Sequence, residues 1–256
     1  PVGVIAGVSA LLIVVFQKDM GTGLTLLGMI LAMVYVAGLN KKLLLGTLGV
    51  VGAAGVFFVV SSPHRIARVL TFLKPSDVSD AASYHIDQAT IALGSGGLFG
   101  KGLGHGVQAF GYLPEAVNDS IFAILGETFG FVGVVLILIL YAVLLRRLLS
   151  TASQTIDATQ RLIVAGVFGL IATHVVVNIG AMTGVIPLTG VTLPFLSFGG
   201  TSLLFTMLTL GVVFAISRYT THQDITEMEA RSETSVRRRG VGRSRDAGSR
   251  RYQRTR

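Results

Sequence analysis

The chain has 256 residues and is rich in apolar residues and poor in charge, which excludes most protein classes. Hydrophobic residues make up 51% and charged residues 13% of it, with a mean hydropathy of +0.71. A soluble domain carries about 25% charged residues, and a disordered chain has fewer apolar ones. Cysteine is absent, so a disulfide-bonded scaffold is excluded too. The composition predicts an integral membrane protein.

Runs without Asp, Glu, Lys or Arg predict where the chain crosses the membrane, because a spanning helix needs about 20 apolar residues. Four of these runs have the length of one helix: residues 1–17, 20–40, 43–64 and 128–145. The run 162–217 is too long for one helix and contains prolines and glycines, so it predicts two, at about 162–184 and 199–217. We therefore expect an all-α polytopic membrane protein with six spans in this chain.

Basic residues in the short connections predict the orientation, because cytoplasmic loops carry an excess of Lys and Arg. They fall between spans two and three, between spans four and five, and after span six: Lys41, Lys42, Arg146, Arg147, Arg161 and the C-terminal tail. This pattern predicts a cytoplasmic C-terminus and places the long segment of about 61–118 on the outer side. The chain begins at Pro1, so we expect it to be the back part of a longer protein with further spans.

The predicted domains are a membrane body, residues 1–217, and a basic tail, residues 218–256. The tail contains 11 Lys or Arg and 5 Asp or Glu among Gly, Ser and Thr, so no core can form there. We expect a disordered cytoplasmic segment held near anionic lipid. A purely solubilising tail is the alternative, and no nucleic acid is expected as a partner beside a membrane.

A glycine-rich stretch in the outer segment, residues 94–106, is here called the glycine loop. It resembles a phosphate-binding loop but lacks the Walker spacing, because Ser95 and Gly102 stand where Gly and Ser or Thr are required. One interpretation is a flexible surface loop. The other is a backbone lying close to a ligand, with Lys101 as a cation for an anionic group. The spacing of Gly126 and Gly130 predicts ordinary close packing of helices in lipid.

Carboxylates near the start of the fourth span are the strongest candidates for chemistry. Asp119 is at the mouth of this span, and Glu127 is two turns deeper, where helical spacing puts both near one face. An ionisable residue inside a span is a functional hypothesis by default. An internal ion pair is as good an interpretation for Glu127, and a helix N-cap is the alternative for Asp119.

Two other features have a structural and a functional interpretation. Residues 64–74 predict a short amphipathic helix at the headgroup boundary, with Arg65 and Arg68 meeting lipid phosphates or a ligand. His174 is in the middle of a span, where a hydrogen bond between helices is the better hypothesis than a proton relay. The five dispersed histidines form no transition-metal motif.

Seven motif-like stretches follow one another along this sequence. They are Gln17-Lys-Asp-Met-Gly-Thr22, Tyr84-His-Ile-Asp-Gln88, Gly94-Ser-Gly-Gly-Leu-Phe-Gly-Lys-Gly102, Tyr112-Leu-Pro-Glu-Ala116, Asp119-Ser-Ile-Phe-Ala123, Asn178-Ile-Gly180 and Thr192-Leu-Pro-Phe-Leu-Ser-Phe-Gly-Gly-Thr-Ser202. In this order they resemble the SEDS family of bacterial cell-wall polymerases, FtsW, RodA and SpoVE. The resemblance covers nearly everything from Pro1 to about Arg218, and the sequence around Asp119 is nearer to the division type FtsW than to the elongation type RodA.

The resemblance implies a peptidoglycan glycosyltransferase of about ten spans in the bacterial cytoplasmic membrane. Such an enzyme polymerises lipid II into β-1,4 glycan and releases undecaprenyl pyrophosphate. Asp119 matches the catalytic aspartate of the family, and Glu127 and Asp19 are supporting residues. A divalent cation, Mg or Mn, can assist the leaving group. The expected substrate-binding residues are Lys101, Arg65, Arg68, Glu115, Gln88, Gln108, Ser197, Thr201 and Ser202.

The resemblance also implies partners, and three departures from the family pattern accompany it. A class B penicillin-binding transpeptidase and other divisome or elongasome membrane proteins are the expected partners. Lys18 stands where Pro is usual, His85 replaces Gln, and Thr128 replaces a second Glu. Two other functions stay open: a flippase for the lipid-linked precursor, with a broken span and buried polar residues, and a non-catalytic scaffold that recruits a transpeptidase.

Overall fold

The computed structural model describes residues 20–38, 81–108 and 111–219, together with scattered positions between 45 and 66. The described residues form helices and connecting loops without a strand. The predicted spans at 1–17 and 43–64, the amphipathic helix at 64–74 and the tail from 220 onward lie outside these residues or are covered only in scattered positions. The helices are α2 (Met20–Val36), α5 (Ala81–Ser95), α6 (Ile121–Gln154), α7 (Ala158–Met182) and a last helix, Gly200–Tyr219.

Three of these helices are long and apolar enough to cross a membrane: α6, α7 and the helix Gly200–Tyr219. The apolar helix α2 is shorter, with 17 residues. The predicted spans at 20–40, 128–145, 162–184 and 199–217 therefore correspond to helices, although α6 extends well beyond its charge-free run at both ends. The all-α membrane fold expected from the composition is confirmed.

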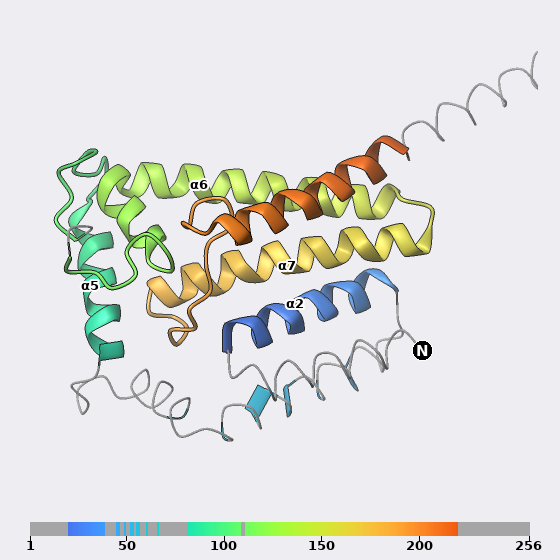
Figure 1. Cartoon of the computed structure of the whole chain (residues 1–256), viewed down its shortest axis with the longest axis horizontal. Coiled ribbons are helices and arrows are strands. Elements are labelled where there is room, and N and C mark those ends of the chain that lie inside the picture. The colour runs from blue at the N-terminus through green and yellow to red at the C-terminus, as the bar shows by residue number, and fades with distance from the viewer. Residues whose placement is uncertain are drawn as a thin grey trace, which may run out of the picture. The chain divides into compact units, whose positions relative to one another are not determined.

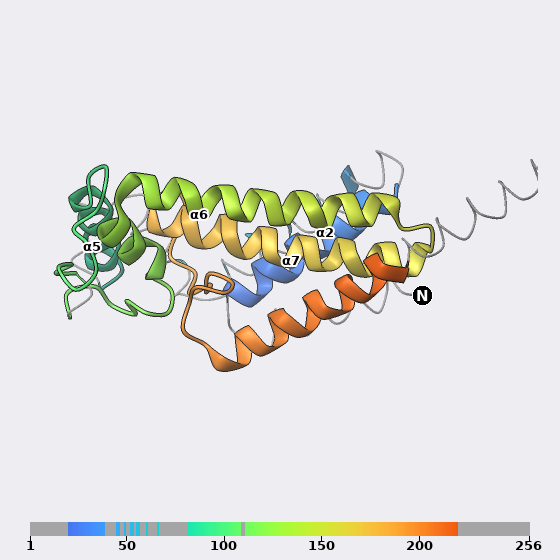
Figure 2. The same cartoon turned by 90° about the horizontal axis from the view of Figure 1, so that it is seen from above.

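Helix α7 packs against α2 on one side and α6 on another, and α5 crosses the end of the bundle beside the start of α6 (Figure 1). Figure 2 shows α6 and α7 running side by side along their lengths. Asp157 caps the start of α7, where its side chain accepts a hydrogen bond from the N–H of Thr159 at 2.7 Å. Residues 155–157 form the short connection between α6 and α7. Arg146, Arg147 and Arg161 lie near this end of the two helices.

The contact between α2 and α7 depends on small residues. A Cβ on Gly28 would lie 1.8 Å from Oγ1 of Thr173, and one on Gly169 would lie 2.6 Å from Cβ of Ala32. Larger side chains would separate the helices, and small residues are the usual means of close helix packing in lipid. The crossing holds the middle of α2 against the middle of α7.

Helix α6 is interrupted at Gly130, where φ is 67° and ψ is −166°. Figure 1 shows its first turns bent away from its long part. This finding corrects the prediction of ordinary helix packing for Gly130 only, since Gly126 does pack closely against α5: a Cβ there would lie 2.5 Å from Cδ2 of Leu93. The physical reason is that a left-handed φ is open to glycine and costly for other residues.

By its contacts the chain divides into two compact units, Pro1–Val213 and Phe214–Arg256. Of the second unit, the structure describes only residues 214–219, which are the end of the last helix. The candidate site described below lies within the first unit.

Candidate functional site

Asp119 lies in a short segment directly before α6, and the backbone of this segment is held by the loop that precedes the last helix. The carbonyl of Val117 accepts a hydrogen bond from the N–H of Phe198 at 2.8 Å. The carbonyl of Asn118 accepts one from the hydroxyl of Ser197 at 2.7 Å. The hydroxyl oxygen of Ser197 also accepts from a loop N–H, so Ser197 is committed to holding this backbone.

Asn178 on α7 holds the next peptide of the same segment. Its Nδ2 donates to the carbonyl of Asp119 and to the carbonyl of Val191, each at 2.7 Å. The side chain of Asn178 is 1% exposed, so these bonds are shielded from water. One amide group therefore joins the backbone of the candidate base to α7 and to the loop 183–199.

Ser120, and not Asp119, is the residue at the N-cap of α6. Its buried hydroxyl donates to the carbonyl of Pro114 at 2.8 Å and accepts from Nε2 of His85 on α5 at 2.6 Å. The N-cap alternative for Asp119 is therefore wrong. The expectation that Asp119 and Glu127 share a helix face is wrong as well, because Asp119 precedes the first helical residue.

Glu115 forms the turn that leads into this segment, with a left-handed φ of 47°. Its carbonyl accepts from the N–H groups of Asn118 at 3.0 Å and Ser120 at 3.2 Å. Its carboxylate accepts from Nδ2 of Asn118 at 2.6 Å and is otherwise exposed. The side chain of Glu115 thus supports the turn and still faces solvent.

A cavity of about 380 Å³ lies between α2, α7 and the loop 183–199. Asp119 does not line it but lies next to one of its lining residues. Gly190 lines this cavity, and Oδ2 of Asp119 is 3.5 Å from the position that a Cβ on Gly190 would take. His174 lines it as well, and its Nδ1 donates to the carbonyl of Thr192 at 3.0 Å. The predicted hydrogen bond of His174 is therefore present, with a loop carbonyl as its partner instead of another helix.

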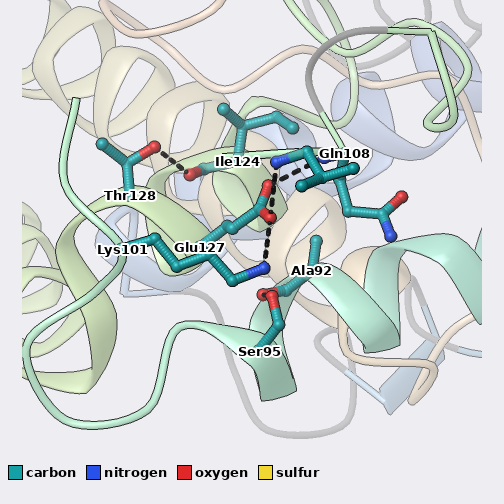
Figure 3. A network of polar contacts seen from close by, with 8 residues as sticks. Ala92, Ser95, Lys101, Gln108, Ile124, Glu127 and Thr128 are labelled. Atoms are coloured by element: carbon teal, nitrogen blue, oxygen red, sulfur yellow. Dashed lines mark hydrogen bonds and ion pairs between the residues drawn. The ribbon is translucent and has the colours of Figure 1, made fainter. Parts of the chain in front are cut away.

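Glu127 is fully buried and has three donors around its carboxylate (Figure 3). Nζ of Lys101 forms an ion pair with Oε1 at 2.8 Å. The N–H of Val107 donates to Oε1 at 2.9 Å and that of Gln108 to Oε2 at 3.1 Å. The interpretation of Glu127 as an internal ion pair is thus confirmed, and Lys101 is a structural cation whose charge is balanced within the chain.

The backbone of the glycine loop docks on the interruption of α6. In an unbroken helix the N–H groups of Phe131 and Val132 would bond to the carbonyls of Glu127 and Thr128, four residues earlier. Here the loop satisfies all four groups. Gly97 and Leu98 accept from Phe131 and Val132 at 2.9 and 3.1 Å, and Lys101 and Gly102 donate to Glu127 and Thr128 at 2.9 and 3.0 Å.

This docking explains why the loop is rich in glycine. A Cβ on Gly96 would lie 2.0 Å from the carbonyl oxygen of Gly126, and one on Gly100 would lie 2.1 Å from that of Thr128. The loop backbone therefore lies close to α6 of its own chain, where the second prediction had expected a ligand. The loop lies at the surface, as the first prediction had it, but its backbone is bonded to α6, and Lys101, which the second prediction offered to an anionic ligand, is paired with Glu127.

The remaining predicted site residues are spread out. Gln88 is half-buried on α5, the side chain of Gln108 is buried, and Thr201 and Ser202 are exposed at the start of the last helix. Arg65, Arg68 and Asp19 lie outside the described residues. Among the residues that the structure describes, no group of three or more His, Asp or Glu could hold a metal ion.

Sequence reasoning found Asp119 but missed the residues that fix it. Asn178 and His85 act on residues 119 and 120 from positions 59 and 35 residues away. Both stood in stretches used for the family resemblance, so a motif signal was present, but only the fold brings them to Asp119. Together with Ser197 they make this segment a rigid support for one carboxylate beside a cavity.

The family model described as "Cell cycle protein", which covers FtsW, RodA and SpoVE, matches residues 2–222. The chain belongs to this family. It is 44% identical over 213 residues to stage V sporulation protein E of Bacillus subtilis (strain 168), covering 82% of this chain and 58% of that protein. It is 38% identical over 202 residues to a probable peptidoglycan glycosyltransferase FtsW of Geobacter sp. (strain M18), covering 78% and 55%.

Solved structures agree with this membership. One, described as "Structural coordination of polymerization and crosslinking by a peptidoglycan synthase complex", has a TM-score of 0.63 at 31% identity and covers 82% of this chain and 58% of that one. A crystal structure of a mutant of the rod-shape-determining protein RodA of Thermus thermophilus has a TM-score of 0.54 at 29% identity, covering 84% and 56%. The chain thus spans a little over half the length of these relatives.

Proposed function

We propose that the protein of which this chain is part is a peptidoglycan glycosyltransferase that polymerises lipid II into β-1,4-linked glycan. The main support is the position of Asp119: a carboxylate at the mouth of a span, on a backbone held by three other parts of the fold, beside a cavity of about 380 Å³. Family membership adds support, because relatives of this chain are named probable peptidoglycan glycosyltransferases.

In the proposed reaction Asp119 is the general base. Its carboxylate takes the proton from the 4-hydroxyl of the acceptor sugar while that oxygen bonds to the anomeric carbon of the donor. The bond from this carbon to the pyrophosphate breaks at the same time, and undecaprenyl pyrophosphate leaves with the electron pair. Attack from the side opposite the leaving group inverts the anomeric centre. A fixed backbone at Asp119 favours this step because correct positioning lowers the barrier.

The leaving pyrophosphate needs positive charge. Lys101 is paired with Glu127, so the proposal relies on Arg65, Arg68 or a divalent cation for this purpose. Glu115 keeps an exposed carboxylate in the turn before Asp119, where it can meet the acceptor sugar. Thr201, Ser202 and Gln88 are proposed as further polar contacts of the substrate.

The proposed location is the bacterial cytoplasmic membrane, with the C-terminus in the cytoplasm and Asp119 on the outer side. The short α6–α7 connection carries basic residues at both of its ends, in Arg146, Arg147 and Arg161, which is typical of a cytoplasmic loop. A class B transpeptidase is the proposed partner, since a similar chain was solved in a complex that polymerises and crosslinks.

Reconstitution of the full-length protein with lipid II in vesicles tests this function. We expect glycan polymer, detected by gel separation, and a yield that rises when a class B transpeptidase is present. Lipid II that crosses the bilayer without polymer formation would instead support a flippase. Neither polymer nor crossing, with the transpeptidase still bound, would support a scaffold.

A further inference from the structure

The glycine loop combines two kinds of surface that are usually found apart. Toward α6 it directs four backbone hydrogen bonds and the ammonium group of Lys101, all of which have partners there. Away from α6 it exposes three large apolar side chains: Leu98, Phe99 and Leu103 are 64%, 81% and 77% exposed. A loop in water normally has the reverse arrangement, with apolar groups covered and polar groups outward.

The position of this loop along α6 places it at membrane depth. Gly130, where the loop docks, is 16 residues before Arg146, and the positions between them carry no charge. At 1.5 Å per residue this separation is about 24 Å, whereas the hydrocarbon core of a bilayer is about 30 Å thick. With Arg146 at one boundary of the core, the docking point falls at or just inside the other boundary.

The surface beside the loop is itself apolar and exposed. Phe131 and Val132, whose N–H groups bond to the loop, are 62% and 51% exposed. The same surface continues along α6 through Leu136, Ile139, Leu140 and Val143, all more than half exposed. Since α6 is long and apolar enough to span the membrane, this surface lies within the thickness of the bilayer, and the loop extends it at its N-terminal end.

Backbone pairing makes such a position energetically possible. Irregular backbone is tolerated at membrane depth only where its polar groups are satisfied by protein or water. The interruption of α6 supplies partners for four backbone groups of the loop, two further backbone bonds lie within the loop, and the ion pair with Glu127 balances the charge of Lys101.

We propose that the glycine loop is a lipid-embedded element, with Leu98, Phe99 and Leu103 inserted among the acyl chains of the leaflet that holds the start of α6. The occupant of this surface is the bilayer itself. The inference is independent of the proposed catalytic function, because it rests on the polarity and depth of the loop alone.

Spin labels at single cysteines test the proposal. The 256 residues contain no Cys, so Phe99→Cys gives one label in this chain, with any cysteine elsewhere in the full-length protein replaced by Ser. Leu140→Cys in the middle of α6 is the lipid control, and Ile156→Cys in the α6–α7 connection is the water control. All three positions are apolar and more than 60% exposed, so exposure alone cannot separate them.

The measurement is the ratio of collision rates with oxygen, which partitions into lipid, and with a water-soluble nickel complex, in protein reconstituted into bilayers. We expect the ratio at position 99 to be close to that at 140 and several-fold above that at 156. A ratio at 99 equal to that at 156 overturns the proposal. Protection from both reagents also overturns it, because protein would then cover the loop. Leu103→Cys repeats the test if the Phe99 variant does not fold.

Discussion

Asp119 and Glu127 are two carboxylates eight residues apart that the fold places in opposite situations. Glu127 is fully buried, and its carboxylate is occupied by Lys101 and two backbone N–H groups. Asp119 has its backbone held instead, while its side chain reaches the glycine that lines the cavity. The first arrangement stabilises structure, and the second fits the proposed role of Asp119 as a base.

Asp119→Asn should lower the rate of lipid II polymerisation by about 10²- to 10⁴-fold, the usual contribution of a general base. The bonds that hold residues 117–119 use backbone carbonyls, so Asn keeps them, and Ser120 remains the N-cap. Folding should therefore change little. The rate is measured with purified full-length protein and lipid II, and folding by thermal unfolding in detergent.

Glu115→Gln is the matched control for this prediction. Glu115 is an exposed carboxylate in the same segment, and Gln retains an oxygen that can accept from Asn118. We expect a much smaller loss of rate. A folded Asp119→Asn protein that polymerises at nearly the wild-type rate would falsify the assignment of the base.

Removal of Lys101 should destabilise the protein more than removal of Glu127, its partner in the ion pair. Lys101→Met leaves a buried negative charge with only two donors, which should cost about 3 kcal/mol of unfolding free energy. Glu127→Gln leaves a lysine whose side chain is 34% exposed and thus not fully buried, so about 1–2 kcal/mol is expected. Thermal unfolding of both variants and of the double variant measures the difference.

The double variant should be about as stable as Glu127→Gln alone, because no uncompensated charge remains in it. If Lys101→Met proves no more harmful than Glu127→Gln, the pair does not carry the buried charge described here. The sequence offered the ion pair only as one of two interpretations for Glu127. The sequence could not decide between the two interpretations, because Lys101 is 26 residues from Glu127 and helical spacing does not predict where loop residues lie.

At the scale of elements, the spans were predictable and the interruption of α6 was not. Charge-free runs located α2, α6, α7 and the last helix because the hydrocarbon core excludes charge wherever it is crossed. Gly126 and Gly130 fit the small-residue spacing of packed helices, and that spacing is the same whether the partner is a helix or a loop. Short helices were expected in the outer segment, but α5 was not located there, because its motif residues were read only as candidates for chemistry.

Gly130→Ala should destabilise the protein by roughly 2 kcal/mol or more. Its φ of 67° is costly for alanine, and the new Cβ would lie 2.3 Å from the backbone nitrogen of Gly100. Gly94→Ala is the matched control. Gly94 is helical in α5 with no atom within 4 Å of the new Cβ, so stability should be unchanged or rise by about 0.5–1 kcal/mol.

Both glycine variants are compared by thermal unfolding in the same detergent. Equal stability of the two would show that the loop does not depend on the shape of the α6 interruption. A loss confined to Gly130→Ala supports the docking of the loop by its backbone.

At the scale of the whole molecule, the orientation in the membrane can be tested directly. If the outer segment faces away from the cytoplasm, as proposed, a cysteine at Ser79 should react with an impermeant thiol reagent added to intact spheroplasts. A cysteine at Ser150, near the end of α6, should react only after lysis. The reverse pattern would contradict the orientation and the outward-facing site together.

The way in which α6 is completed also has a consequence for biosynthesis. The ribosome makes the glycine loop before it makes α6, yet four backbone groups of α6, at residues 127, 128, 131 and 132, have their partners in that loop. An unsatisfied backbone group in lipid costs several kcal/mol. Unless α6 enters the bilayer as an unbroken helix, the loop has to close on it during insertion, so we expect insertion of this helix and closure of the loop to be coupled.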